Sequence, residues 1–140
     1  MRAAISLGTD QDELLRLVGF AEKFARRHAV PEAERTWLLI ILEELFTNVV
    51  NHGYDGAAAM AQIEVALAVK GGKLTIDFSD DGRPFDPLSA TLPALDLPAA
   101  DRPIGGLGLH LLRSFVDHAR YSRDSGRNRL VLTRNIVRPG

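Results

Sequence analysis

Hydrophobic residues in the first third of the chain recur with the period of two amphipathic helices. Apolar side chains return every three or four positions through residues 10–28, and a longer apolar stretch follows in residues 31–54. A proline opens the second stretch and a glycine ends it, as is common at helix boundaries. The pattern therefore predicts a short strand at residues 2–7, followed by two consecutive helices.

The period then changes to that of β-strands. Apolar residues alternate with polar or small residues through 62–69, and again through 74–78 after a Gly-Gly pair that can form a tight turn. Near the end of the chain, the same alternation predicts strands at 118–123 and 129–137, joined by a turn at 124–128.

A long segment with little periodicity separates the two pairs of strands. Residues 83–103 contain five of the seven prolines, and a loop of this length inside a compact domain is usually functional or disordered. A third helix is expected at 106–117. Together these elements predict a single domain, residues 1–140, with the architecture of an α/β two-layer sandwich. In it, a mixed, mainly antiparallel sheet is covered on one face by helices.

Composition narrows the class of protein. The 46% hydrophobic and 25% charged residues are ordinary values for a globular domain, and the net charge of −1 provides no basic surface for nucleic acid or an anionic membrane. The absence of cysteine excludes disulfides and thiolate sites. No apolar run approaches the roughly 20 residues that a membrane-spanning helix needs. We therefore expect a cytoplasmic domain.

The first motif whose residues could take part in catalysis or metal binding lies on the second predicted helix. Glu44 and Asn48 are four residues apart, so their side chains share one face, and Asn51 extends the same polar stripe. A carboxylate and an amide oxygen on a rigid helix can supply a general base and a ligand for Mg²⁺. A solvated helix face explains the same spacing without any chemistry.

The second motif is the sequence Ser-Asp-Asp-Gly-Arg-Pro, which follows the strand that ends near Phe78. Asp80 at this strand end can accept a hydrogen bond from a ligand, while Gly82 lets the backbone approach it. An ordinary Asp-Gly turn is the alternative.

The third motif is a glycine-rich start to the helix predicted at 106–117. Backbone N–H groups and the helix dipole favour phosphate at such a position, although a flexible linker or an N-cap explains the glycines equally well. The sequence is neither a Walker A motif nor a dinucleotide-binding fingerprint. The residues concerned are Gly105, Gly106, Leu107 and Gly108.

In this order and spacing, the three motifs resemble the Bergerat (GHKL) ATP-binding fold of histidine kinases and gyrase-type ATPases. Within that fold the chain is similar above all to the anti-sigma factor serine-protein kinase family, the RsbW and SpoIIAB kind. The resemblance covers nearly the whole chain, and the stretch from Glu44 to Asn48 with the trailing His52-Gly53-Tyr54 is its most specific part.

This resemblance implies roles for the individual residues. Glu44 would act as base on the attacking hydroxyl, Asn48 would coordinate the Mg²⁺ that bridges the triphosphate, and Asp80 would bind the adenine amino group of ATP. Residues 83–104 would form the lid over the nucleotide. The further nucleotide contacts that it implies are Asn51, His52, Gly82, Gly105, Gly106, Leu107 and Gly108.

One residue departs from the pattern of the broader fold. Pro84 stands where the sequence Asp-x-Gly-x-Gly often has its second glycine. Proline fixes φ and removes an N–H, so any backbone contact made at this position must be lost or rerouted.

The function that the resemblance implies is phosphorylation, by Mg-ATP, of a serine on a STAS-domain anti-anti-sigma protein. The chain would otherwise sequester a sigma factor or a similar target, as a homodimer, without contacting nucleic acid or membrane directly. Two alternatives remain at this point. One is an ATP-binding partner-switching module without kinase activity, in which Glu44 is structural. The other is a scaffold without nucleotide binding, for which Pro84 is the only indication.

Overall fold

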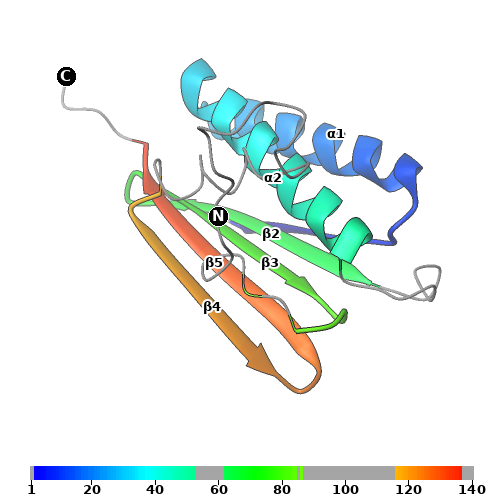
Figure 1. The fold of residues 1–140 in the computed structure, drawn as a ribbon. Coiled ribbons are helices and arrows are strands. Elements are labelled where there is room, and N and C mark those ends of the chain that lie inside the picture. Colours follow the sequence, from blue (N-terminus) through cyan, green and yellow to red (C-terminus); the bar gives the residue numbers. More distant parts are fainter. Residues whose placement is uncertain (1, 53–61, 85, 87–115, 137–140) are drawn as a thin grey trace, which may run out of the picture.

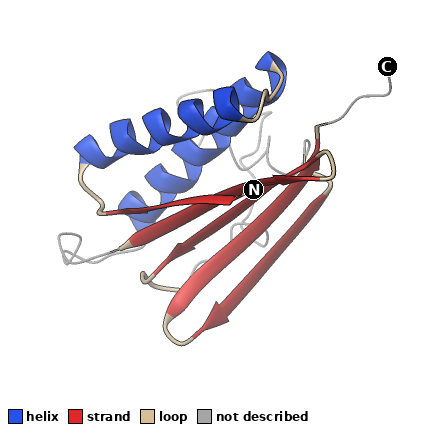
Figure 2. Cartoon of the chain, turned by 180° about the vertical axis from the view of Figure 1, so that it is seen from behind, coloured by secondary structure: helices blue, strands red, loops and turns tan. Residues whose placement is uncertain are grey.

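The computed structural model describes residues 2–52, 62–84, 86 and 116–136. Two helices pack side by side on one face of a five-stranded sheet (Figures 1 and 2), which confirms the predicted α/β two-layer sandwich. The strand order is β1-β2-β3-β5-β4, and every pairing among the described strands is antiparallel. The elements are β1 (Arg2–Leu7), α1 (Gln11–Arg27), α2 (Glu32–His52), β2 (Ile63–Lys70), β3 (Lys73–Asp80), β4 (His118–Asp124) and β5 (Arg127–Asn135).

Tight turns set the register of both hairpins. Gly71 and Gly72 have φ values of 57° and 75°, and Ser125 and Gly126 have φ values of 53° and 77°. Two consecutive residues with positive φ are typical of two-residue hairpin turns that match the twist of the strands. The turn predicted at 124–128 was therefore too long, because β5 begins at Arg127.

The alternation of β3 and β5 decides which side chains face the helices. In β3 the buried residues Leu74, Ile76 and Phe78 are followed at the same period by Asp80. In β5 the buried residues Leu130 and Leu132 are preceded in the same way by Asn128. Two polar residues of adjacent strands therefore point into the layer between the sheet and the helices.

The helices bury different shares of their surface. α1 covers the sheet with a single apolar face, whereas α2 is apolar over most of its length and forms the centre of the core. The buried residues of α2 are Glu34, Trp37, Leu38, Ile41, Leu42, Leu45, Phe46, Asn48 and Val49. Neither helix in the described part of the chain is long and apolar enough to cross a membrane.

Part of the sequence prediction lies outside the described residues. This applies to residues 106–115 of the third expected helix and to nearly all of the expected lid. Val116 and Asp117 are described, and neither is helical. The N–H of Asp117 instead donates to the Thr133 carbonyl over 2.9 Å, which leads the chain into β4.

A buried ion pair ties the first turn of α2 to the end of β5. Glu34 is only 1% exposed, and the Arg134 guanidinium donates to both of its carboxylate oxygens. The same guanidinium lies over the Trp37 ring, 5.3 Å from the ring centroid. A carboxylate at this depth is tolerable only while its cation is present.

We expect Arg134→Met to lower the free energy of unfolding by about 3 kcal/mol, because the variant leaves the Glu34 carboxylate buried without its partner. Urea denaturation of both proteins measures the difference. The matched control is Arg129→Met, which removes the ion pair of Arg129 with Asp77 on the exposed face of the sheet and should cost less than about 1 kcal/mol. Equal losses in the two variants would contradict the special role of the buried pair.

Candidate functional site

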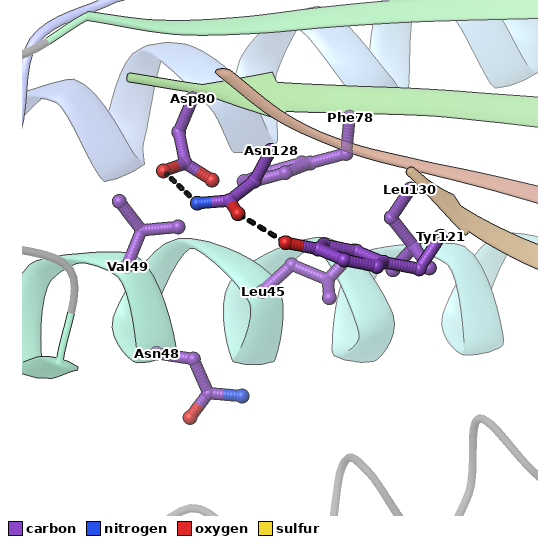
Figure 3. A pocket seen from close by; sticks show the side chains of 8 residues that line it. All are labelled: Leu45, Asn48, Val49, Phe78, Asp80, Tyr121, Asn128 and Leu130. Carbon is purple, nitrogen blue, oxygen red and sulfur yellow. Dashed lines mark hydrogen bonds between the residues drawn. The ribbon is translucent and has the colours of Figure 1, made fainter. Parts of the chain in front are cut away.

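A cavity lies between the second half of α2 and the strands β3, β4 and β5. Its wall is mostly apolar and carries a few convergent polar groups, which is the usual composition of a small-molecule site. We call it the α2–sheet cavity. The residues that line it are Leu45, Asn48, Val49, Phe78, Asp80, Tyr121, Asn128 and Leu130 (Figure 3).

The structure brings two of the residues predicted from sequence, Asn48 and Asp80, to this one cavity. They do not face each other. Figure 3 shows Leu45 and Val49 directed toward the sheet residues, while the Asn48 amide turns away from the Asp80 carboxylate. The site therefore offers polar groups at two separate places with apolar surface between them, which suits an elongated ligand.

Asp80 is a buried carboxylate with an organised set of donors. It is 6% exposed, and its Oδ1 accepts hydrogen bonds from the Gly82 N–H at 2.9 Å and from Asn128 Nδ2 at 3.0 Å. Oδ2 accepts none from the described residues, so the carboxylate keeps an acceptor for a ligand N–H. The alternative of an Asp-Gly turn has a counterpart here, because the Gly82 N–H donates to the side chain of Asp80 and holds the carboxylate.

Burial raises the pKa of Asp80 above its ordinary value, because the charged form is desolvated. The hydrogen bonds from Asn128 and Gly82 favour the ionised form and oppose this rise. The negative charge of Asp81 adds to it, and the positive charge of Arg127 opposes it. Such a balance of opposing influences on one buried group is common at functional sites.

Asn128 connects three parts of the site. It is 5% exposed, and its Nδ2 donates to Asp80 and, over 2.7 Å, to the Arg83 carbonyl. Its Oδ1 accepts a hydrogen bond from the Tyr121 hydroxyl (Figure 3). Asn128 is not among the residues predicted for the site, because the sequence pattern predicted a turn at 124–128. The signal was the period-two alternation of β5, which puts Asn128 on the same face as Leu130.

The β4–β5 hairpin also holds the chain on both sides of Asp80. Arg123 donates from Nη1 to the carbonyl of Gly82 over 2.7 Å, and Arg127 donates from Nη2 to Ser79 Oγ over 3.2 Å. Gly82 itself is buried. The segment after β3 is therefore fixed by side chains from two other strands.

On α2, Asn48 and Glu44 carry buried polar atoms that have no partner among the described residues. Asn48 Nδ2 and Glu44 Oε1 make no hydrogen bond within that part of the chain, although neither atom is accessible to solvent. Asn48 is 7% exposed, so the alternative of a solvated helix face is wrong for this residue. Burial raises the pKa of Glu44, and the neighbouring charge of Glu43 adds to the effect. Unpaired buried polar groups cost free energy and often mark a functional site.

The donor set fits a hard cation only in combination with a ligand. The oxygens of Asn48 and Glu44 are of the kind that Mg²⁺ prefers. However, the described residues contain no cluster of three or more His, Cys, Asp or Glu side chains that could hold a metal alone. Mg²⁺ bound through one or two protein groups typically completes its shell with substrate phosphates and water.

Other predicted site residues are not part of the described geometry. Asn51 and His52 lie in the last turn of α2, but their side chains are outside the described residues. The whole glycine-rich motif, Gly105, Gly106, Leu107 and Gly108, is outside them as well.

Comparison with known proteins agrees with this geometry. A family model for the histidine kinase-like ATPase domain matches residues 8–134. The serine/threonine-protein kinase BtrW of Bordetella bronchiseptica is 31% identical over 99 residues, which cover 71% of this chain and 69% of that protein. The serine-protein kinase RsbW of Halalkalibacterium halodurans is 30% identical over 96 residues, which cover 62% of this chain and 54% of that protein.

Solved structures extend the likeness to the fold. The RsbU and RsbW domains of a Mycobacterium tuberculosis protein superpose with a TM-score of 0.70 at 18% identity, covering 99% of this chain and 33% of that chain. The histidine kinase domain of a blue-light-activated kinase from Erythrobacter litoralis gives a TM-score of 0.55 at 15% identity, covering 89% and 60%. At these identities the structures support a common fold.

We expect Asn128→Leu to raise the pKa of Asp80 further. In the parent protein the hydrogen bond from Asn128 favours the ionised carboxylate, and the variant removes this bond. At neutral pH the free energy of unfolding should fall by about 2 kcal/mol. This loss should shrink as the pH falls through the raised pKa, since protonated Asp80 no longer buries a charge. Carboxylate ¹³C chemical shifts during a pH titration measure the pKa, and urea denaturation at several pH values measures the stability.

Tyr121→Phe is the matched control for this variant. It removes a hydrogen bond to the same amide but leaves the bond from Asn128 to Asp80 in place. The pKa of Asp80 should therefore change much less. An equal rise in both variants would show that the Asn128–Asp80 bond does not control the titration.

Proposed function

The chain belongs to the histidine kinase-like ATPase domain family, within which it is RsbW-like, and from this premise we propose that it is a Mg-ATP-dependent serine-protein kinase. In this proposal the α2–sheet cavity binds the nucleotide. The observation that carries it is the buried Asp80 carboxylate, held in one cavity with the buried Asn48 of α2.

The purine would lie on the apolar wall of the cavity. Phe78 and Leu130 from the sheet, with Leu45 and Val49 from α2, provide that surface. The adenine amino group would donate to the carboxylate of Asp80, whose Oδ1 is already fixed by Asn128 and Gly82. A carboxylate held in this way discriminates by hydrogen bonding, since a base without a donor there leaves a buried charge unpaired.

The triphosphate would extend from the purine toward the side of α2 that carries Asn48. The side-chain oxygen of Asn48 would hold Mg²⁺ together with phosphate oxygens, and a bound Mg²⁺ neutralises phosphate charge. The backbone of Gly105, Gly106, Leu107 and Gly108, together with Asn51 and His52, remains our proposed set of further nucleotide contacts. Residues 83–104 remain the proposed lid.

Glu44 would act on the nucleophile, which belongs to the protein substrate. It lies one helical turn before Asn48, and burial raises the pKa of its carboxyl group. It would accept the proton of a serine hydroxyl as the serine oxygen bonds to the γ-phosphorus. The bond between that phosphorus and the β–γ bridging oxygen breaks in the same step, and ADP leaves.

We propose a STAS-domain anti-anti-sigma protein as the substrate, a sigma factor or similar target as the second partner, and a cytoplasmic homodimer as the working form. Two of the relatives bear the name of serine or serine/threonine protein kinases, and one solved relative joins an RsbW domain to an RsbU domain. The chain spans about half of the RsbW relative and a third of that two-domain structure, so these partners rest on the likeness alone.

One observation favours the alternative of an ATP-binding module without kinase activity. Asn48 and Asp80 line the α2–sheet cavity, whereas Glu44 does not. In that case the nucleotide would control partner binding, and Glu44 would have only a structural effect on α2.

We expect Asp80→Asn to weaken the binding of Mg-ATP at least tenfold, because an amide replaces the charged acceptor for the adenine amino group. Isothermal titration calorimetry measures the affinity. Asp77→Asn is the matched control, since it changes the net charge equally but lies on the exposed face of the sheet in an ion pair with Arg129. If the parent protein does not bind Mg-ATP, or if both variants weaken binding equally, the proposed site is wrong.

We expect Glu44→Gln to slow phosphate transfer from radiolabelled ATP to a STAS-domain protein by about 100-fold or more, with ATP affinity unchanged. Glu43→Gln, which changes the exposed neighbour on the same helix, is the control and should transfer phosphate like the parent. Transfer by Glu44→Gln at the parental rate would exclude Glu44 as the base. ATP binding without transfer in the parent would favour the module without kinase activity.

A further inference from the structure

A second hollow lies between the start of β1 and the second half of α1, and it shares no residue with the α2–sheet cavity. We call it the β1–α1 hollow. It has a volume of about 180 Å³, and it is lined by Arg2, Ala3, Phe20, Lys23, Phe24, Arg27 and His28. Arg2 pairs with Ala68 near the end of β2, whereas Asp80 pairs with Ile63 at the other end of that strand. The two sites are therefore at opposite ends of the sheet.

The lengths of β1 and α1 explain why these residues meet. The six residues of β1 run about 20 Å in one direction, and the 17 residues of α1 return about 25 Å after a short connection. The end of α1 is consequently brought back over the start of β1 (Figure 2). Phe20 and Phe24 are four residues apart, so they lie on one face of the helix and form the apolar floor.

The rim of the β1–α1 hollow is positively charged, and the residues described around it supply no counter-charge. Arg2, Lys23 and Arg27 are exposed, and none of the described residues that line the hollow carries a carboxylate. Within the described part of the chain, none of these three side chains makes an ion pair or a hydrogen bond. His28 packs against Phe24, with 4.3 Å between the ring centroids.

Stabilisation of the helix end explains only part of this charge. Cations in the last turn of a helix interact favourably with its dipole, and Arg27 lies in the last turn of α1. Arg2 is on a strand, however, and Lys23 precedes that turn. The helix dipole therefore does not explain why Arg2 and Lys23 lie around the same apolar floor, in a chain whose net charge is −1.

We propose that the β1–α1 hollow is a docking site for an acidic segment of a partner protein, anchored by one large apolar side chain. The apolar side chain would cover Phe20 and Phe24, and flanking carboxylates would pair with the cations of the rim. A single hollow of this size suits one side chain. A nucleic acid would require a longer track of positive charge along the surface.

The test measures the binding of a fluorescein-labelled peptide with the repeating sequence Glu-Asp-Leu-Glu by fluorescence anisotropy. We expect Lys23→Glu combined with Arg27→Glu to weaken binding about tenfold or more, because two attractions become repulsions. The matched control combines Arg26→Glu with Arg35→Glu. These two residues border a different groove on the other side of α1, and the control changes the net charge by the same amount.

Circular dichroism and Mg-ATP affinity verify that both double variants are folded. The proposal is supported if only Lys23→Glu/Arg27→Glu loses the peptide and if a Glu-Asp-Ser-Glu peptide binds much more weakly than the leucine peptide. Equal losses in both variants, or equal binding of the serine peptide, would overturn it in favour of a general charge effect.

Two further outcomes would replace the proposed occupant. Tighter binding of a labelled DNA duplex than of the peptide, lost in Lys23→Glu/Arg27→Glu, would assign the hollow to nucleic acid. A dimer in sedimentation analysis that the same variant dissociates would assign it to a second copy of the chain. Neither outcome bears on the α2–sheet cavity, because Mg-ATP affinity is measured separately.

Discussion

Burial of the Asp80 carboxylate is the constraint on which the candidate site depends. A desolvated charge is costly unless fixed dipoles replace the lost water, and here the Asn128 amide and the Gly82 N–H do so. The Asn128 amide must keep one orientation, because its nitrogen serves Asp80 and Arg83 while its oxygen serves Tyr121. One side chain therefore fixes the end of β3 relative to β4 and β5.

The polar groups of α2 differ from those of the sheet, because some of their buried atoms have no hydrogen-bond partner among the described residues. Leu45 and Val49 pack toward the sheet and hold the helix in place (Figure 3). The same packing buries Asn48, whose Nδ2 has no partner in the described part of the chain, and it buries one oxygen of Glu44. The extensive apolar core around α2 can offset this cost, which a helix with little burial could not do. The sheet side of the site is thus preorganised by hydrogen bonds, and the helix side by packing.

The fold was predictable from the sequence, whereas the polar network was not. Strict alternation in residues 63–69 and 74–78 defines a half-buried hairpin, because a shift of one residue would expose its apolar set. The alternation of β5 extends to Asn128 as well, but the turn predicted at 124–128 concealed it. The position of Asn128 depends on the two-residue turn at Ser125 and Gly126, and serine rarely adopts the positive φ that this turn needs. The burial of Asn48 was equally hidden, since a helix that is apolar over most of its surface does not indicate which polar residue is covered.

The same network gives Pro84 a physical explanation. The segment after β3 is held through acceptors, because Arg123 donates to the Gly82 carbonyl and Asn128 donates to the Arg83 carbonyl. The N–H of Gly82 donates to Asp80. None of these bonds needs an N–H at position 84, so proline removes no hydrogen bond from this part of the site. Its fixed φ instead restricts the unfolded chain directly after the anchored carbonyl, which lowers the entropy that folding must overcome. The departure from the glycine pattern is therefore compatible with the hydrogen-bond network that holds Asp80.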